Sequence, residues 1–448
     1  TLIFGNVEFG VRIAALLCMG VASFFVYRST EELYGRGSAL VAAVLMQVLP
    51  ALFLAGLFMT PDTPLVAAWA ATLYFLQRAL LQGHGRAWWG AGVALGLGLI
   101  SKYTIALLVP ATLVFLLCDR PSRRWLLRPL PYAAGVLTLL IFSPVILWNA
   151  RHEWASFAFQ TSQRLAEAPH FSLHRLILAA LALLTPIGAA ALPYLLRSGA
   201  AGAAAAGAPD ADDPPEARRL RFLRVYTLVP LSVFVLFSLR HTIKLDWTGG
   251  MWVAIVPALA QAIAARGAAA LPPWLRRCWG ATALVVLLGY GATLHYLTLG
   301  PPGVPYSAQL QALPVAWSDL GRQVDSEAAQ LRAAGTAHPL VVGMNRYMLA
   351  SELAFYARDP VQAAQNTASQ NLFGPSGLMY EQWFPAPLQE GRTLLLVALD
   401  ARELDDARLA PQVESLGPVR SGELRRNGHL VAQYFYRTAF GYRSARGE

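Results

Sequence analysis

The feature that most constrains this chain is a series of apolar runs, separated by short loops, that fills its first two thirds. There are about ten runs, and several approach the ~20 residues that a helix needs to cross a bilayer. They lie at roughly 8–27, 37–58, 64–82, 87–101, 104–118, 130–148, 173–196, 223–239, 248–265 and 278–298. We therefore predict an α-helical polytopic membrane protein, with this membrane domain at residues 1–299.

The composition agrees with a membrane protein and argues against a nucleic-acid partner. Of 448 residues, 56% are hydrophobic and only 14% are charged. A soluble protein of this size could not cover its surface with so few charges. The net charge of +10 would suit a nucleic acid. However, the arginines occupy loops between apolar runs and do not form a stripe interleaved with aromatic residues.

The basic residues predict how the chain is oriented in the membrane. Alternate loops are rich in arginine, and by the positive-inside rule these loops are cytoplasmic. They hold Arg28 and Arg36; Arg78 and Arg86; Arg120, Arg123, Arg124 and Arg128; Arg197, Arg218, Arg219, Arg221 and Arg224; and Arg266, Arg276 and Arg277. The same alternation puts Thr1 and everything after residue 300 outside. Residues 200–215, rich in Ala, Gly, Pro and Asp, are expected to form a flexible cytoplasmic loop.

From residue 300 onward the hydropathy falls and the periodicity changes. Residues 339–344 and 393–399 have the pattern of buried strands, and 429–436 that of a late strand. Residues 347–356 have the pattern of an amphipathic helix. We predict a small extracytoplasmic α/β domain at residues 300–448.

Ionisable residues gather at the predicted outer ends of the apolar runs. Asp62 lies between two prolines, Lys102 precedes Tyr103, and Arg151 and Lys244 end later runs. Lys102 and Lys244 are the only lysines of the chain, and both fall on this face. A lysine is a compact, mobile point charge that suits a phosphate. The pattern therefore predicts a cationic pocket for a lipid phosphate, with Asp62 as its acid.

Simpler interpretations of the same residues stay open. A lysine near a helix end often only reaches to the headgroups. Asp62 could cap the following helix, with Thr63 and Pro64 in its first turn. Trp154 and Trp247 fit an interfacial aromatic belt. The functional hypothesis depends on one acid and several cations meeting on one face.

The sequence supports no metal site and no cofactor. His84, His170, His174 and His338 lack ligand spacing, and the cysteines Cys18, Cys118 and Cys278 belong to apolar runs. No phosphate-cradling glycine loop is present, because Gly96 and Gly98 lie within an apolar run, where they favour close helix packing. A nucleotide-sugar donor is therefore unsupported, and a lipid-linked donor fits better.

Several phrases in this order resemble the membrane glycosyltransferases of GT-C type. This group includes the dolichyl-phosphate-mannose protein mannosyltransferases and the bacterial aminoarabinose transferases that modify lipid A. The phrases are FGNVEFGVR at 4–12, PDTPL at 61–65, GLGLISKYT at 96–104, WASF at 154–157 followed by Phe159-Gln160, Lys244 to Trp247, and Asn345-Arg346-Tyr347 with Glu352 and Phe355-Tyr356. Together they span nearly the whole chain.

The resemblance implies an outer-face enzyme of a bacterial inner membrane. It would transfer a sugar from a polyprenyl-phosphate carrier to lipid A, another glycan, a lipid or a protein. Lys102 and Tyr103 would hold the carrier phosphate, assisted by Lys244 and Arg151. The cavity that receives the acceptor would involve the residues Trp154, Trp247, Arg346 and Tyr347. Asp62 would be a secondary acid, since the family's main catalytic acid belongs to a first outer loop that we expect to precede Thr1.

Two other functions are weighed against this one. A transporter or flippase of lipid-linked sugars would have internal inverted repeats and broken membrane helices, and the sequence shows neither clearly. A non-catalytic assembly or binding protein on the same scaffold is the third hypothesis. Transfer of labelled sugar in vitro separates the enzyme from both.

Overall fold

The computed structural model describes residues 4–5, 7–158, 160, 169–197, 214–265, 272–298, 315–336, 338–374, 376–426 and 428–444. Packing divides the chain into a larger unit, Thr1–Leu287, and a smaller unit, Leu288–Glu448. Most of the loop predicted at 200–215 lies outside the described residues, and so does the domain boundary predicted at 299–300.

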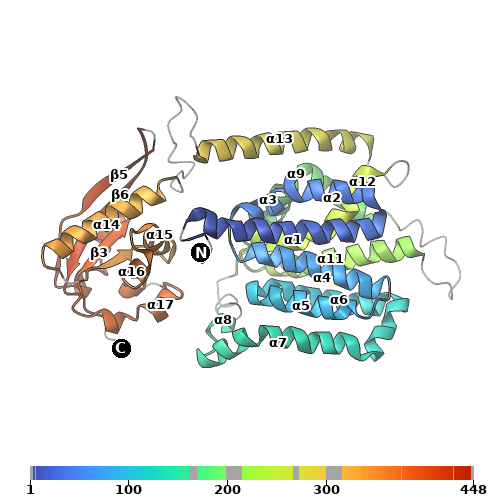
Figure 1. Ribbon diagram of the computed structural model, residues 1–448, viewed down its shortest axis with the longest axis horizontal. Coiled ribbons are helices and arrows are strands. Elements are labelled where there is room, and N and C mark those ends of the chain that lie inside the picture. Colours follow the sequence, from blue (N-terminus) through green and yellow to red (C-terminus); the bar gives the residue numbers. More distant parts are fainter. Residues whose placement is uncertain are drawn as a thin grey trace. The chain divides into compact units, whose positions relative to one another are not determined.

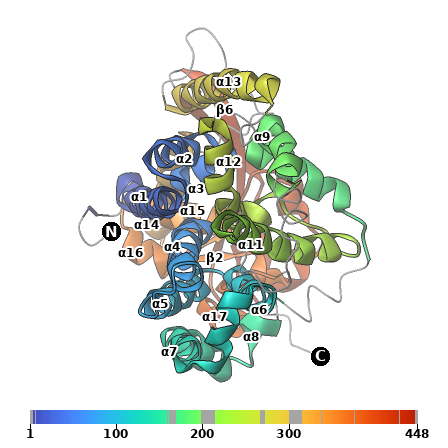
Figure 2. The same cartoon turned by 90° about the vertical axis from the view of Figure 1, so that its right-hand side faces the viewer.

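Helices that lie side by side make up the larger unit (Figure 1), and a view turned by 90° shows most of them nearly end on (Figure 2). The elements, in chain order, are α1 (Glu8–Tyr34), α2 (Arg36–Val48), α3 (Pro50–Leu57), α4 (Asp62–Leu80), α5 (Ala87–Ser101), η1 (Tyr103–Leu107), α6 (Leu108–Cys118), η2 (Arg120–Leu127), α7 (Pro129–Arg151), α8 (Ala155–Ala158), α9 (Leu173–Arg197), α11 (Pro215–Ser238), η4 (Leu245–Ile255), α12 (Val256–Ala264) and α13 (Pro273–Thr298).

Each predicted apolar run coincides with a helix or with two consecutive helices, so the polytopic helical fold is confirmed. Among the described residues, six helices are long and apolar enough to span a membrane. The number rises to eight if two bent pairs, α2 with α3 and the η1–α6 segment with η2, each count as one span. Helices α4 and α5 do not meet this test. That all of the roughly ten apolar runs cross the membrane therefore stays a prediction.

Helix α4 fails the test for a physical reason. Nearly every residue from Leu65 to Leu80 is buried, including Trp69, which is 1% exposed. A helix that is surrounded by other helices does not need the hydropathy that lipid contact demands, and it can carry Thr72 and Gln77 in the core. Gln77 is bonded there by Ser29, whose hydroxyl donates to Oε1 at 2.5 Å.

Helix α9 is broken, which the sequence did not indicate clearly. Thr185 has a left-handed backbone, with φ of 66°, directly before Pro186. The Thr185 hydroxyl accepts the N–H of Gly188 at 3.2 Å and so satisfies a donor of the second half of the helix. A β-branched residue in this conformation is strained and persists only where packing holds it.

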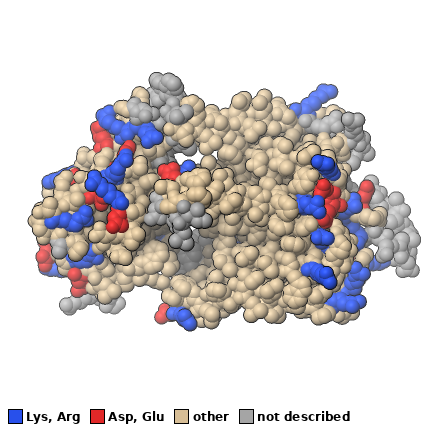
Figure 3. Space-filling view, in the orientation of Figure 1, with Lys and Arg blue, Asp and Glu red and all other residues tan. Residues whose placement is uncertain are grey.

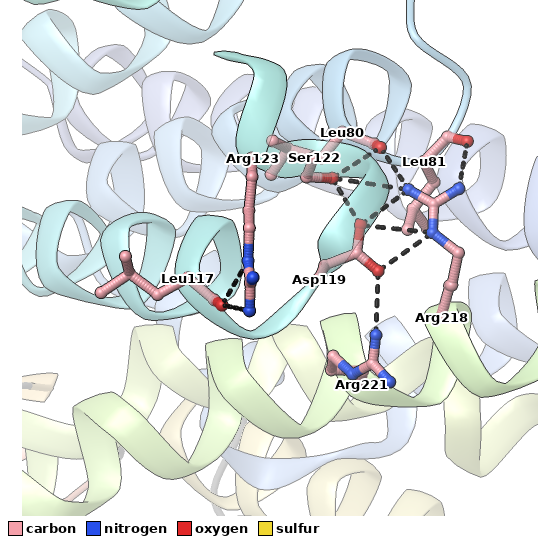
Figure 4. Close-up of polar contacts among 8 residues, drawn as sticks. All are labelled: Leu80, Leu81, Leu117, Asp119, Ser122, Arg123, Arg218 and Arg221. Atoms are coloured by element: carbon pink, nitrogen blue, oxygen red, sulfur yellow. Dashed lines mark hydrogen bonds and ion pairs between the residues drawn. The ribbon is translucent and has the colours of Figure 1, made fainter. Parts of the chain in front are cut away.

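The arginines of α4, η2 and α11 meet at one end of the larger unit, which we call the Arg-rich end. Asp119, fully buried between α6 and η2, accepts hydrogen bonds from Arg218, with Nη2 to Oδ2 at 2.8 Å, and from Arg221 at 3.0 Å (Figure 4). Arg218 also donates to the carbonyl oxygen of Leu80 at 2.8 Å. These bonds join the last turn of α4, η2 and the start of α11. Figure 3 shows Lys and Arg side chains gathered at one end of this unit.

The opposite end, which we call the lysine end, holds both lysines. Helix α4 runs from Asp62 to its contact with Arg218 at the Arg-rich end, and α11 runs from that contact to Ser238. The chain then turns back through η4, which packs on α4. An added Cβ at Gly250 of η4 would lie 3.3 Å from Leu65. Lys244, directly before η4, is therefore at the same end as Asp62.

The smaller unit contains a sheet in the order β2-β1-β3-β6-β4, with β5 paired to β6. The strands are β1 (Leu340–Gly343), β2 (Thr367–Ser369), β3 (Leu394–Ala398), β4 (Ser415–Leu416), β5 (Arg420–Arg426) and β6 (His429–Phe440). β1 pairs in parallel with β2 and β3, and β6 is antiparallel to β3. The helical segments are α14 (Trp317–Ala333), α15 (Met348–Tyr356), α16 (Pro360–Ala364), η8 (Gln370–Phe373), α17 (Tyr380–Trp383), η9 (Ala386–Gln389), η10 (Ala401–Asp405) and η11 (Ala410–Gln412).

The predicted α/β character of this unit is confirmed. The strands expected at 339–344, 393–399 and 429–436 correspond to β1, β3 and the first part of β6, and the expected helix corresponds to α15. Helix α14 and the strands β2, β4 and β5 were not predicted. β2 and β4 are too short for a periodic pattern, and β5 is exposed at most of its positions.

Candidate functional site

Asp62 and Lys102 form an ion pair at the lysine end. Lys102 Nζ lies 2.6 Å from Asp62 Oδ1, and the two side chains are 22% and 21% exposed. A second contact fixes the same two segments, because the Ser101 hydroxyl donates to the carbonyl oxygen of Pro61 at 2.6 Å. The pair is thus held in place and still open to solvent.

The two chain segments present these side chains for local reasons. Pro61 is the N-cap of α4 and Asp62 is in its first turn, where a carboxylate is stabilised by the helix dipole. Asp62 makes no capping hydrogen bond, so the alternative that it caps this helix is wrong. Instead the Thr63 hydroxyl donates to the carbonyl oxygen of Ala55 at 2.6 Å and ties α3 to α4. Lys102 follows the last turn of α5 in an extended conformation, which turns the chain into η1.

Tyr103 lies beside the pair and is fixed by a second group of contacts. Its hydroxyl is 2.7 Å from the hydroxyl of Ser156, and either group could be the donor. Its ring meets Phe142 edge-on at 5.8 Å and Phe157 at 5.3 Å. A phenol held on both its polar and its apolar side keeps one orientation, which suits a residue that positions a ligand.

The turn after α7 brings Ser156 to Tyr103, and Asn149 holds this turn. Asn149 is fully buried, and its Oδ1 accepts the N–H of Ser156 at 3.0 Å. Its main-chain carbonyl accepts the N–H of Trp154 at 2.8 Å. Glu153 and Trp154 have positive φ values of 52° and 56°, which non-glycine residues adopt only when the surroundings hold them.

Arg151 and Trp154 were predicted at this end, and the structure places both beside the same turn. Arg151 is the last residue of α7 and is exposed. Trp154 is 49% exposed, and its ring stacks on Phe157 at 5.8 Å. Trp154 is thus connected to Tyr103 through Phe157. A half-exposed indole stacked on a phenylalanine is equally compatible with a ligand contact and with an interfacial belt.

Lys244 and Trp247 occupy the segment between α11 and η4. Lys244 is exposed, and its carbonyl oxygen accepts the N–H of Trp247 at 3.3 Å. The Trp247 ring packs on Phe237 at 5.7 Å. The buried Ser172 supports this segment, because its hydroxyl donates to the carbonyl oxygen of His241 at 2.6 Å and accepts the N–H of Ile243 at 3.2 Å.

Arg346 and Tyr347 lie in the smaller unit, at the carboxyl end of β1. Both are exposed. Asn345 Oδ1 accepts the N–H of Leu349 at 3.0 Å and so starts α15. β1 lies between β2 and β3, and ligands of parallel sheets bind at the carboxyl ends of such strands. Their part in the acceptor cavity stays a prediction.

Sequence reasoning missed Ser156, Asn149 and Ser172. Each is a small polar residue next to an apolar run, and in a helical membrane domain most such residues bond only their own helix. Nothing in the local sequence distinguishes the three that join separate elements. As regards metals, the described residues contain no group of three or more His, Cys, Asp or Glu side chains that could hold an ion.

Comparison with known proteins gives a sequence match at the N-terminal part of the chain. Residues 1–148 match the family described as dolichyl-phosphate-mannose-protein mannosyltransferase. This stretch includes the Asp62–Lys102 pair and Tyr103. A segment of 119 residues is 32% identical to an undecaprenyl phosphate-alpha-4-amino-4-deoxy-L-arabinose arabinosyl transferase of Sodalis glossinidius. That segment covers 25% of this chain and 21% of the relative, so the chain matches well under two thirds of the relative's length.

The fold gives a match over almost the whole chain. The apo crystal structure of ArnT from Cupriavidus metallidurans is similar with a TM-score of 0.56, at 17% identity, over 97% of this chain and 84% of that one. The archaeal oligosaccharyltransferase AglB from Archaeoglobus fulgidus gives a TM-score of only 0.42, at 13% identity, over 87% of this chain and 58% of that one. Residues 1–148 thus match the mannosyltransferase family, and the chain as a whole has an ArnT-like fold, both in agreement with the resemblance of its motifs.

Proposed function

We propose that this protein transfers a glycosyl group from a polyprenyl-phosphate-linked sugar to an acceptor, at the outer face of a bacterial inner membrane. The acceptor would be lipid A, another glycan, a lipid or a protein. The lysine end would face the periplasm, together with the smaller unit, and the Arg-rich end would face the cytoplasm. The match of residues 1–148 to a dolichyl-phosphate-mannose-dependent family and the similarity to an undecaprenyl-phosphate-dependent transferase support a lipid-linked donor.

The ion pair of Asp62 with Lys102 is the observation that carries the proposal. Its 2.6 Å contact puts a fixed ammonium at the mouth of the helical unit, about one fifth exposed and thus open to a ligand. A cation held in place before the reaction stabilises negative charge that develops on a leaving group, without reorganisation at that moment. The departing polyprenyl phosphate is such a leaving group.

The reaction would proceed by direct displacement. The acceptor hydroxyl oxygen forms a bond to the anomeric carbon, the bond from that carbon to the phosphate oxygen breaks, and the phosphate keeps the electron pair. The acceptor proton passes to a carboxylate. Asp62 would act as a secondary acid that holds Lys102 and orients the acceptor. In this scheme Lys102, Tyr103, Lys244 and Arg151 contact the carrier phosphate.

The proposed acceptor side of the site rests on aromatic packing and has no ion pair of its own. Trp154 and Trp247 offer aromatic faces at the lysine end, and each is packed on a phenylalanine. Aromatic faces beside polar groups suit sugar rings as well as lipid headgroups. Arg346 and Tyr347 would contribute from the smaller unit.

A transfer assay with matched variants tests the proposal. Purified protein in lipid nanodiscs receives a radiolabelled polyprenyl-phosphate sugar and a mixture of acceptors, and the release of polyprenyl phosphate is followed. Lys102→Met is expected to lower the transfer rate by about 10²–10³, since it removes a cation that is already in place to stabilise the leaving phosphate. Lys102→Arg, which keeps the charge, should retain more activity. Equal rates for the wild type and Lys102→Met, with a fully active wild type, would rule out the role of Lys102.

The break at Thr185 in α9 is the specific observation that favours the transporter as a second candidate, because transporters use discontinuous helices at their binding sites. Proteoliposomes separate the two functions. A transporter would move the lipid-linked sugar across the bilayer without releasing polyprenyl phosphate. The enzyme would release it from donor presented on one side only.

A further inference from the structure

A cavity of ≈ 260 Å³ opens between α4, α5, α6, η2 and α7. It extends from the start of α5, the start of α7 and the end of η2 to the middle of α4, α5 and α7, so it belongs to the half of the larger unit next to the Arg-rich end. Its walls are almost entirely apolar, with side chains such as Leu76, Leu95 and Leu113. Neither Asp62 nor Lys102 contributes to them.

Two buried indoles in the wall have unsatisfied donors. Trp88 and Trp125 are 4% and 7% exposed, and their rings meet edge-on at 5.8 Å. The Nε1 atom of each is buried and has no hydrogen-bond acceptor among the described residues. A buried donor without a partner costs about 1–3 kcal/mol, and buried tryptophans usually find one.

The hydroxyl groups around the cavity are already used, which sharpens what a ligand must supply. The hydroxyls of Thr72 and Thr138 donate to main-chain carbonyls of α4 and α5 at 2.7 and 2.9 Å. The Tyr132 hydroxyl donates to the carbonyl oxygen of Leu126 at 2.7 Å. A matching ligand therefore needs a long apolar part and, near the two indoles, acceptor oxygens.

Positive charge lies at the mouth of the cavity. The segment η2 bends away from the helix before it by 116°, and Leu127 at its end is 91% exposed. Arg124 lies over the Trp125 ring, with Cζ 5.6 Å from the ring centroid, and Arg128 is exposed next to the start of α7. Asp119, the acid of this segment, is fully buried and bonded to Arg218 and Arg221. Basic segments of this kind attract anionic headgroups at the cytoplasmic leaflet.

We infer that this cavity binds one anionic phospholipid of the bilayer. An acyl chain would fill the apolar part, and Arg124 with Arg128 would hold the phosphate. Glycerol-ester or phosphate oxygens would accept from the indoles of Trp88 and Trp125 once these rings turn toward the lipid, because both Nε1 atoms are buried without it. The site is separate from the Asp62–Lys102 pair, since Thr72, the first residue of α4 in the cavity wall, lies ten residues after Asp62, about 15 Å at ~1.5 Å per residue. The inference does not depend on the proposed function.

A glycine in the wall provides a specific test. An added Cβ at Gly135 would meet nothing within 4 Å, so Gly135→Leu fills the cavity without an initial clash. The matched control is Gly20→Leu in α1, where an added Cβ is equally unobstructed and the residue does not line the cavity. Phosphatidylglycerol and phosphatidylcholine bound to the detergent-purified full chain are counted by native mass spectrometry. We expect a preference for phosphatidylglycerol that falls about tenfold in Gly135→Leu and is unchanged in Gly20→Leu.

A second pair of variants tests the headgroup contact and does not depend on how Gly135→Leu folds. Arg124→Gln with Arg128→Gln should abolish the preference for phosphatidylglycerol over phosphatidylcholine. Arg175→Gln with Arg426→Gln removes the same charge from exposed positions elsewhere and should leave the preference intact. Equal binding of the two lipids by the wild type, or equal losses in variants and controls, would overturn the inference. Displacement of phosphatidylglycerol from the wild type by polyprenyl phosphate at equal concentration would also overturn it, because the cavity would then belong to the carrier.

Discussion

The two ends of the larger unit use charge in opposite ways. At the Arg-rich end, Asp119 is fully buried and is bonded by Arg218, Arg221 and Ser122. At the lysine end, Asp62 is paired with Lys102, and both side chains are about one fifth exposed. The first arrangement satisfies its charges internally and joins α4, η2 and α11. The second keeps a charge accessible, as binding requires. The comparison suggests that one end serves stability and the other serves function.

The largest effect on stability is expected for Asp119→Ala. The substitution leaves Arg218 and Arg221, which are 17% and 26% exposed, without their shared carboxylate. Breaking a buried ion pair on one side costs about 3–5 kcal/mol. The free energy of unfolding in detergent, titrated with SDS, measures it. Arg123→Ala is the control, because Arg123 is exposed and donates only to the carbonyl oxygen of Leu117, six residues before it in α6. A similar loss of stability in this control would contradict the special role of Asp119.

Asn149→Ala is expected to lower the free energy of unfolding less than Asp119→Ala does, and to lower the transfer rate more. It removes the acceptor of the Ser156 N–H within a fully buried site, at a cost of about 1–3 kcal/mol. The turn at Glu153 and Trp154 should relax, since its positive φ values are no longer enforced. Protease sensitivity between α7 and α9 reports that relaxation. Unchanged cleavage together with full transfer activity would show that the turn does not depend on Asn149.

The Asp62–Lys102 pair should contribute little to stability. Partly exposed ion pairs are worth about 0–1 kcal/mol, so Asp62→Asn and Lys102→Met should unfold within that range of the wild type. Their transfer rates should nevertheless fall strongly. If stability dropped as much as in Asp119→Ala, the two ends would not differ, and the contrast drawn here would be wrong.

The smallest effect on transfer is expected for Tyr103→Phe. It removes one hydroxyl contact to Ser156 and keeps the ring packing on Phe142 and Phe157. A single hydrogen bond contributes about 0.5–1.5 kcal/mol. The KM for the donor should rise severalfold, and the free energy of unfolding should fall by no more than this amount. Ser156→Ala should give the same result if the shared contact, and not a direct bond from Tyr103 to the donor, is what matters.

The sequence predicted which residues lie at which end but not which of them touch. The apolar runs and arginine loops were sufficient to put Asp62 and Lys102 on one face, because loops alternate between the two sides of a membrane. Their contact spans 40 residues and depends on how α4 and α5 pack, which periodicity does not encode. Asp119 was not noticed, since an acid after an apolar run looks like any helix end. The break at Thr185 was missed although Pro186 follows it, because a proline within an apolar run can also kink a helix without breaking it.

Direct binding of the donor's phosphate at the lysine end is the central claim, and one titration tests it. Undecaprenyl phosphate is titrated into nanodisc-embedded wild type, Lys102→Met and Arg124→Gln, and its Kd is measured by microscale thermophoresis. The account predicts a Kd at least about tenfold weaker for Lys102→Met, a loss of ~1.4 kcal/mol or more, with Arg124→Gln equal to the wild type. Equal affinity for wild type and Lys102→Met, or a loss only in Arg124→Gln, would contradict it.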